Sequence, residues 1–191
     1  MFIWEMFKMG LKLSLPELAR KTMESKLENK EFEPNDITKE KYSKNKASFV
    51  TLSTRQGKLR GCIGSLKPRK ELWKDVQENA VNAMHDPRFP PLKKKELENV
   101  RIEVSVLSKP KRLDYKTPEE LIKKLKKYMG IILKKGFNSS TFLPQVWEQI
   151  QDKQEFLEHL SIKAGLDKNA WKDEETEIWY YTVMKEKESK K

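Results

Sequence analysis

The segment SFVTLSTRQGKLRGCIG, residues 48–64, carries the clearest strand pattern of the chain. Residues 48–53 are rich in β-branched and aromatic side chains and predict a strand. Residues 55–58 predict a turn, and residues 59–63 predict the returning strand. The segment is therefore expected to form a β-hairpin, the simplest unit of an antiparallel sheet.

The second strand ends in the hexapeptide LRGCIG, in which Gly61 and Gly64 bracket the only cysteine of the chain, Cys62. Glycines allow another stretch of backbone, or a ligand, to approach closely. One interpretation makes Cys62 a nucleophile whose thiolate is favoured by Arg60 and by the glycine amides. The alternative is a small, buried side chain in a tight turn, because cysteine is among the most buried residue types.

The rest of the chain mixes helices with single strands and hairpins. Apolar spacing and capping residues predict helices over residues 14–27, 71–84 and 117–128, and another from residue 152 towards Gly165. Further strands are predicted over residues 100–107, 131–133, 141–143 and 178–183. Because there is no regular βαβ alternation, we expect an α+β fold with a mainly antiparallel sheet flanked by helices.

Composition limits the classes of protein that fit. The chain has 191 residues, enough for one domain or two small ones, with 1 Cys and 2 His. It cannot form an internal disulfide framework or a cysteine-rich zinc site, and its glycines match no Walker or dinucleotide fingerprint. No apolar run is long enough to span a bilayer. We therefore expect a soluble cytoplasmic protein with no metal, no cofactor and no membrane association.

The net charge of +11 raises the question of a polyanionic partner. The basic residues concentrate in residues 47–75 and 108–136, and the second stretch holds Lys123, Lys124, Lys126 and Lys127. These four lysines are predicted on the polar side of an amphipathic helix. They form either an ordinary solvated face or a surface that binds nucleic acid.

Three more residues are candidates for a shared site. His85 is the nearest base for Cys62, or else it caps the end of its helix. Arg88, in a proline-flanked loop, is either a clamp for an anionic ligand or the partner of Glu103 in a salt bridge. Gln145 either points its amide into the same cleft or satisfies turn backbone. We predict that Cys62, Arg60, His85, Arg88 and Gln145 cluster around one surface depression.

Five segments together resemble the AMMECR-type domain family. They are LRGCIG (59–64), DPRFPP (86–91), EVSVL (103–107), LPQV (143–146) and KAGL (163–166), the last followed by Trp171. The resemblance covers roughly residues 49–183 and implies an α+β fold with a smaller subdomain. It also implies a stand-alone bacterial or archaeal member that accompanies Memo-like and radical-SAM proteins. Many members have Asp-Gly where this chain has Met129-Gly130.

The predicted division of the chain follows from these patterns. Residues 1–46 are an N-terminal helix and a polar connection packing on the domain, residues 47–184 are the AMMECR-type domain, and residues 185–191 are a tail too charged to order itself. The family has no established activity, so the resemblance implies a site without a reaction.

Three functions remain open. The first is a binding or accessory domain with a cleft for a small anionic ligand or a protein partner, lined by Arg60, Gly61, Gly64, Arg88, Glu103 and Gln145. The second is a thiol-dependent enzyme with Cys62 as nucleophile, His85 as base and Arg88 as substrate clamp. The third is a nucleic-acid-binding protein that uses its lysine-rich helix.

Overall fold

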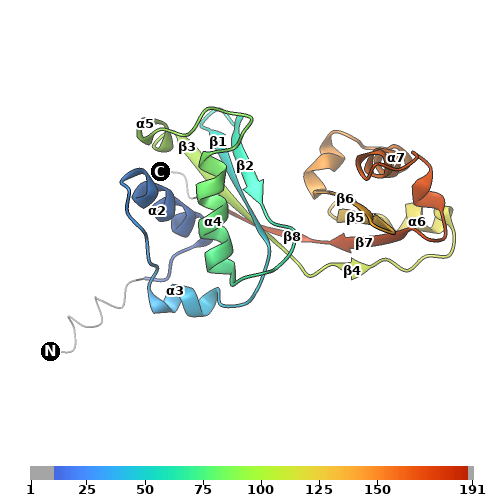
Figure 1. Cartoon of the computed structure of the whole chain (residues 1–191), viewed down its shortest axis with the longest axis horizontal. Coiled ribbons are helices and arrows are strands. Elements are labelled where there is room, and N and C mark those ends of the chain that lie inside the picture. The colour runs from blue at the N-terminus through green and yellow to red at the C-terminus, as the bar shows by residue number, and fades with distance from the viewer. Residues whose placement is uncertain (1–10, 189–191) are drawn as a thin grey trace. The chain divides into compact units, whose positions relative to one another are not determined.

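The computed structural model describes residues 11–188, which form two compact units (Figure 1). Unit 1 runs to Leu107 and resumes at Met184, and unit 2 comprises Ser108–Val183. Each unit has its own four-stranded antiparallel sheet and its own helices. The predicted α+β class and the second, smaller subdomain are confirmed, although the units divide the chain at other positions than the sequence suggested.

The sheet of unit 1 has the strand order β2-β1-β3-β8. Its strands are β1 (Ser48–Thr54), β2 (Leu59–Gly64), β3 (Val100–Leu107) and β8 (Val183–Lys187). The predicted hairpin is β1–β2, and the predicted strand over residues 100–107 is β3. β2 is therefore an edge strand, with one row of backbone groups that no other strand can satisfy.

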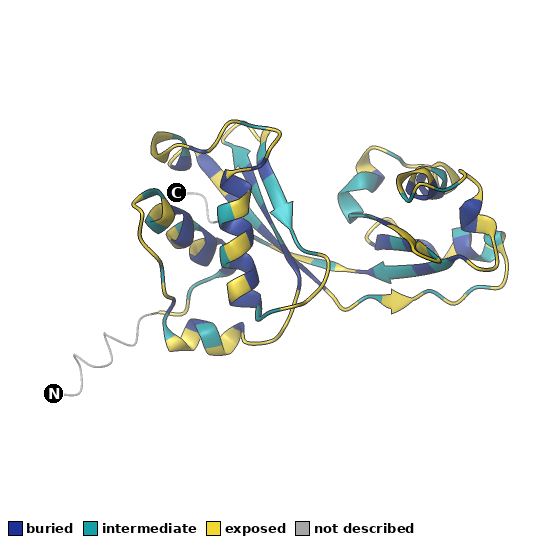
Figure 2. Ribbon diagram, in the orientation of Figure 1, coloured by how far each residue is buried: buried dark blue, intermediate teal, exposed yellow. Residues whose placement is uncertain are grey.

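Helices cover one face of this sheet. They are α2 (Leu15–Leu27) and α4 (Leu72–Met84), which lie side by side. Unit 1 also has the shorter α3 (Asp36–Lys41) and α5 (Lys94–Leu97). Both long helices carry a buried and an exposed side in Figure 2. Alternate residues of β1 and β3, such as Val50, Leu52 and Val104, are fully buried in the same core. α3 lies within residues 28–46, where no periodicity predicted a helix.

The expectation that the chain from Lys185 does not order itself is wrong. Residues up to Lys187 form β8, and the charges of this strand find partners on both sides. Lys185 and Lys187 pair with Glu103. The carboxylate of Glu186 accepts the backbone N–H of Leu15, and Glu188 forms an ion pair with Arg20. A charged strand can join a sheet when each of its faces meets opposite charge.

Unit 2 is built around a second sheet with the order β4-β7-β5-β6. Its strands are β4 (Lys111–Arg112), β5 (Gly130–Lys135), β6 (Asn138–Phe142) and β7 (Glu177–Tyr181). Its helical elements are α6 (Pro118–Lys124), η1 (Pro144–Glu148), α7 (Lys153–Lys163) and η2 (Ala170–Lys172). In its core Trp147 stacks on Phe156 with ring centroids 3.6 Å apart.

The helix predicted over residues 117–128 is shorter than expected. α6 begins, as predicted, with Thr117 as its N-cap, but it ends at Lys124 because Leu125 turns to an extended conformation. The side chain of Leu125 is fully buried, so the chain leaves the helix to place this leucine in the core. Lys126 and Lys127 therefore do not share a helical face with Lys123 and Lys124.

Candidate ligand site on the first sheet

The strand register places Cys62, Thr51 and Glu103 in one row across three neighbouring strands. Thr51 of β1 faces Cys62 of β2 on one side and Glu103 of β3 on the other. All three are partly buried, and they point away from the face that α2 and α4 cover, because strand residues alternate between faces. We call this side of the sheet the polar face.

Alternation adds further residues to the polar face. Its polar members are Thr51, Ser53, Cys62, Arg101, Glu103, Ser105, Lys185 and Lys187, and Phe49 and Gly64 lie on the same side. Glu103 meets the two lysines at 3.6 and 3.3 Å. Arg101 is exposed and adds a third cation to the single carboxylate of the polar face. The polar face is therefore net positive, a charge balance that favours an anionic ligand.

Among the described residues, the thiol of Cys62 has one polar neighbour at hydrogen-bonding distance. Thr51 Oγ1 lies 3.3 Å from Cys62 Sγ. Glu103 is two strands away, a separation of about 9–10 Å between backbones at the usual spacing of a sheet. Glu103 therefore cannot take a proton from Cys62 directly, whereas Thr51 lies between them.

Asp86 and Arg88 hold the backbone of Cys62 at the free edge of β2, and we call these two residues the clasp. The buried Asp86 accepts the backbone N–H of Cys62 at 2.8 Å and the guanidinium of Arg88 at 3.0 and 2.6 Å. Arg88 in turn donates to the carbonyl of Cys62 at 3.4 Å. Arg88 and the Cys62 N–H hold the pKa of the Asp86 carboxyl well below its usual range, against the effect of burial. The LRGCIG and DPRFPP segments thus form one hydrogen-bonded unit.

Arg60 is anchored beside the same clasp. Its guanidinium makes two hydrogen bonds to Glu96, at 3.1 and 3.2 Å, and one to the carbonyl of Pro90 at 2.8 Å. Phe89 lies near two cations, since the guanidinium carbons of Arg60 and Arg88 are 5.8 and 5.7 Å from its ring centroid. The Arg88 side chain is 56% exposed and that of Arg60 only 12%, so Arg88 is the one available to a ligand.

The two glycines of the hexapeptide have packing roles. A Cβ on Gly61 would lie 2.4 Å from the backbone oxygen of Ala83 in α4. A Cβ on Gly64 would lie 2.2 Å from the ring of Phe49. The close approach predicted from these glycines is therefore made by a helix and by an aromatic ring of the protein itself.

His85 occupies the cap position that was the alternative to a catalytic role. It is the C-cap of α4, it is exposed, and its Nδ1 lies 3.0 Å from the carbonyl of Val81, to which it can donate. The salt-bridge partner of Arg88 is Asp86, whereas Glu103 pairs with lysines of β8. The catalytic role of His85 and the ligand-binding role of Arg88 stay predictions.

Gln145 belongs to unit 2, where it lies in η1, while the other predicted site residues belong to unit 1. Its amide oxygen is buried without a hydrogen-bond partner among the described residues. Gly130 also lies in unit 2, and a Cβ there would meet the ring of Tyr181 at 2.2 Å. The prediction that Gln145 shares a depression with Cys62 stays a prediction.

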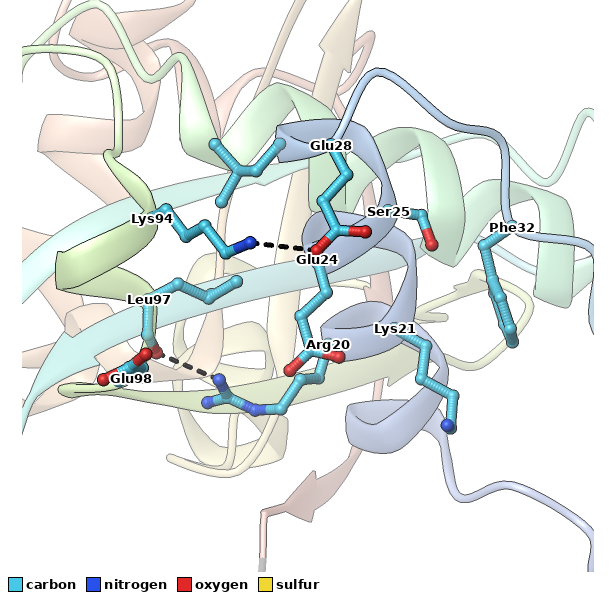
Figure 3. A pocket seen from close by; sticks show the side chains of 10 residues that line it. Arg20, Lys21, Glu24, Ser25, Glu28, Phe32, Lys94, Leu97 and Glu98 are labelled. Atoms are coloured by element: carbon cyan, nitrogen blue, oxygen red, sulfur yellow. Dashed lines mark hydrogen bonds and ion pairs between the residues drawn. The ribbon is translucent and has the colours of Figure 1, made fainter.

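A groove in unit 1 lies elsewhere, between α2 and the segment around α5 (Figure 3). Its volume is about 350 Å³, and none of the predicted site residues lines it. Lys94 bridges to Glu28 across it at 2.9 Å, and Arg20 donates to the carbonyl of Leu97 at 2.9 Å. Its lining combines both signs of charge, and its cations are largely paired.

Within residues 11–188, no three His, Cys, Asp or Glu side chains are grouped so that they could hold a metal ion. The same stretch contains no helix with the length and apolar character needed to cross a bilayer.

Sequence reasoning missed several residues of this site. Thr51 and Ser105 lay in predicted strands, and counting alternate residues from Cys62 and Glu103 would have placed them on the same face. Lys185 and Lys187 were missed because the last strand was ended too early. Asp86 was seen only as the neighbour of His85 and Pro87.

The comparisons with known proteins agree with this fold. The sequence model of the AMMECR1 family matches residues 16–185. A Nanoarchaeum equitans protein, NEQ441, is 42% identical over 173 residues, covering 88% of this chain and 96% of its own length. An Aquifex aeolicus protein is 40% identical, covering 91% and 92%. The crystal structure of the uncharacterized Pyrococcus horikoshii protein PH0010 superposes with a TM-score of 0.80 at 37% identity, covering 92% of this chain and 90% of the other.

Proposed function

The chain belongs to the AMMECR1 family, and from that premise we propose that it is a binding domain whose polar face takes a small anionic ligand. The observation that carries the proposal is the charge balance of that face, where Arg101, Lys185 and Lys187 outnumber the single carboxylate of Glu103. A carboxylate or phosphate would take these lysines as partners in place of Glu103.

Structural order supports binding at this place. The clasp fixes the backbone at Cys62, and the β1–β3 register fixes Thr51 against Glu103. Binding groups held on strands lose little freedom when a ligand arrives, so more of the interaction energy remains as affinity.

Titration calorimetry with inorganic phosphate and with citrate, at constant ionic strength, tests this function. We expect one saturable site that weakens when Lys187 is replaced in Lys187→Gln. Lys30→Gln is a matched control, because the Lys30 side chain is 71% exposed and that of Lys187 is 74% exposed. No binding of either anion to the wild type, or equal weakening by both substitutions, would contradict the proposal.

A thiol-dependent reaction is the second candidate, and the 3.3 Å contact between Thr51 Oγ1 and Cys62 Sγ favours it. In this mechanism Cys62 is the nucleophile, its thiol proton passes to solvent, Thr51 Oγ1 stabilises the thiolate by a hydrogen bond, and Arg88 clamps the substrate. The rate of alkylation by iodoacetamide at neutral pH tests it. A rate above that of free cysteine, slowed in Thr51→Val, supports the enzyme. A rate at or below that of free cysteine counts against it.

Partners remain proposals of the same kind. We propose that a Memo-like or a radical-SAM protein docks on this cytoplasmic domain, and co-purification of the tagged full chain from its host tests this.

Nucleic-acid binding by Lys123–Lys127 is an alternative that a salt titration decides, because phosphate contacts give affinity that falls steeply with ionic strength. α6 ends within this stretch, and Lys124 is engaged by Glu120, which leaves a weaker surface than a continuous basic helix.

A further inference from the structure

Ser105 carries a buried hydroxyl. It is 2% exposed, and its Oγ has no hydrogen-bond partner among the described residues. Other buried serines differ, since Ser48 donates to Asp75 at 2.7 Å and Ser140 to the carbonyl of Leu160 at 2.6 Å. An unpaired buried hydroxyl costs stability, so one that is retained calls for an explanation.

The position of Ser105 on the sheet explains why an unpaired hydroxyl is retained there. Ser105 lies two residues after Glu103 on β3, and strand alternation therefore places it on the polar face. Its register partner on β1 is Phe49, which also faces Gly64 on the other side. The ring of Phe49 lies against Gly64, where an added Cβ would be 2.2 Å from it. Ser105 thus lies on the same face of the sheet as Cys62, Thr51 and Glu103, one place along from their row.

We propose that Ser105 is a binding residue of the polar face and that its hydroxyl donates to a terminal oxygen of the anionic ligand. This inference rests on the proposed function. The group that reaches so buried a hydroxyl has to be small, and a single oxygen of a carboxylate or phosphate meets that requirement. The same oxyanion can form an ion pair with Lys185 or Lys187. The hydroxyl and the lysines therefore recognise the same kind of group.

The substitution Ser105→Ala has effects of opposite sign on stability and on binding. Without ligand, removing an unpaired hydroxyl should raise the melting temperature, by about 2–4 °C for a chain of this size. With inorganic phosphate as the probe, loss of the hydrogen bond should weaken binding about tenfold in titration calorimetry.

Ser48→Ala is the matched control, because Ser48 lies on the neighbouring strand and its hydroxyl is already bonded to Asp75. It should lower the melting temperature and leave phosphate affinity unchanged. A lower melting temperature in Ser105→Ala would overturn the inference, since the hydroxyl would then already have a partner. Unchanged phosphate affinity in Ser105→Ala, with binding still dependent on Lys187, would overturn it while sparing the proposed function. Absence of phosphate binding to the wild type would overturn both.

Discussion

The carboxylate of Asp86 accepts a 2.8 Å hydrogen bond from the backbone N–H of Cys62. The bond ties the loop after α4 to the exposed edge of β2, where no strand could satisfy that N–H. Asp86 also holds Arg88, which reaches back to the carbonyl of the same cysteine. Two distant segments of the sequence therefore stabilise each other, and together they hold the backbone beneath the polar face.

Replacing this carboxylate in Asp86→Asn should destabilise the protein by about 2–3 kcal/mol, because a buried group that bonds to charge is lost and Arg88 is left unpaired. The free energy of unfolding from urea titration measures the effect. Glu174→Gln is the control, since Glu174 is an exposed carboxylate with no ion pair in the described part of the chain. A midpoint for Asp86→Asn equal to that of the control would show that the clasp is not stabilising.

The clasp also predicts a pH dependence. Arg88 lowers the pKa of Asp86 in the folded protein below its unfolded value of about 4. The stability from this group is therefore fully present above that unfolded value and is lost as the pH falls through the lower folded pKa. The difference in unfolding free energy between wild type and Asp86→Asn should shrink as the pH is lowered from neutral into the acid range. A constant difference would exclude ionised Asp86 as its source.

Gly61→Ala should destabilise the packing of β2 on α4. The new methyl would lie 2.4 Å from the Ala83 backbone oxygen, and neither strand nor helix can yield without disturbing the core. We expect a loss of about 1–3 kcal/mol, the usual cost of overpacking. Cys62→Ala, one residue away and without a clash, should cost less. Equal losses in the two variants would mean that the close approach is not what requires glycine.

Much of unit 1 could be predicted because its signals are local. The β1–β2 hairpin, β3 and α4 each follow from apolar spacing within one short segment. The last strand could not, because β8 is held by contacts distant in sequence, such as Glu188 with Arg20. The high charge density from Lys185 onwards predicted a disordered tail. The segment is ordered because its charged side chains pair with residues distant in sequence.

Only part of the candidate site could be predicted, because some of its residues meet only through contacts distant in sequence. Glu103 and Cys62 are both on the polar face, but Thr51, which joins them, is recognised only from the register of β1 with both neighbours. The end of α6 was misplaced because the burial of Leu125 outweighs the helical preference of the lysines around it.

The contact between Glu188 and Arg20 predicts that the C-terminal strand stabilises unit 1. Both side chains are 20% exposed, and Arg20 also donates to the carbonyls of Leu97 and Val100. Glu188→Gln should lower the unfolding free energy by about 1–2 kcal/mol, through loss of a half-buried ion pair. Glu24→Gln, on the same helix as Arg20, serves as the control for a simple change of net charge. An effect no larger than that of the control would indicate that this ion pair contributes little.

The most direct test of anion binding at the polar face is an NMR titration of the ¹⁵N-labelled full chain with inorganic phosphate at constant ionic strength. We expect saturable shifts of the amide signals of Thr51, Cys62 and Glu103, lost together in the double variant Lys185→Gln/Lys187→Gln. Shifts confined to Lys123–Lys127, or no saturable shift at any of these amides, would contradict it.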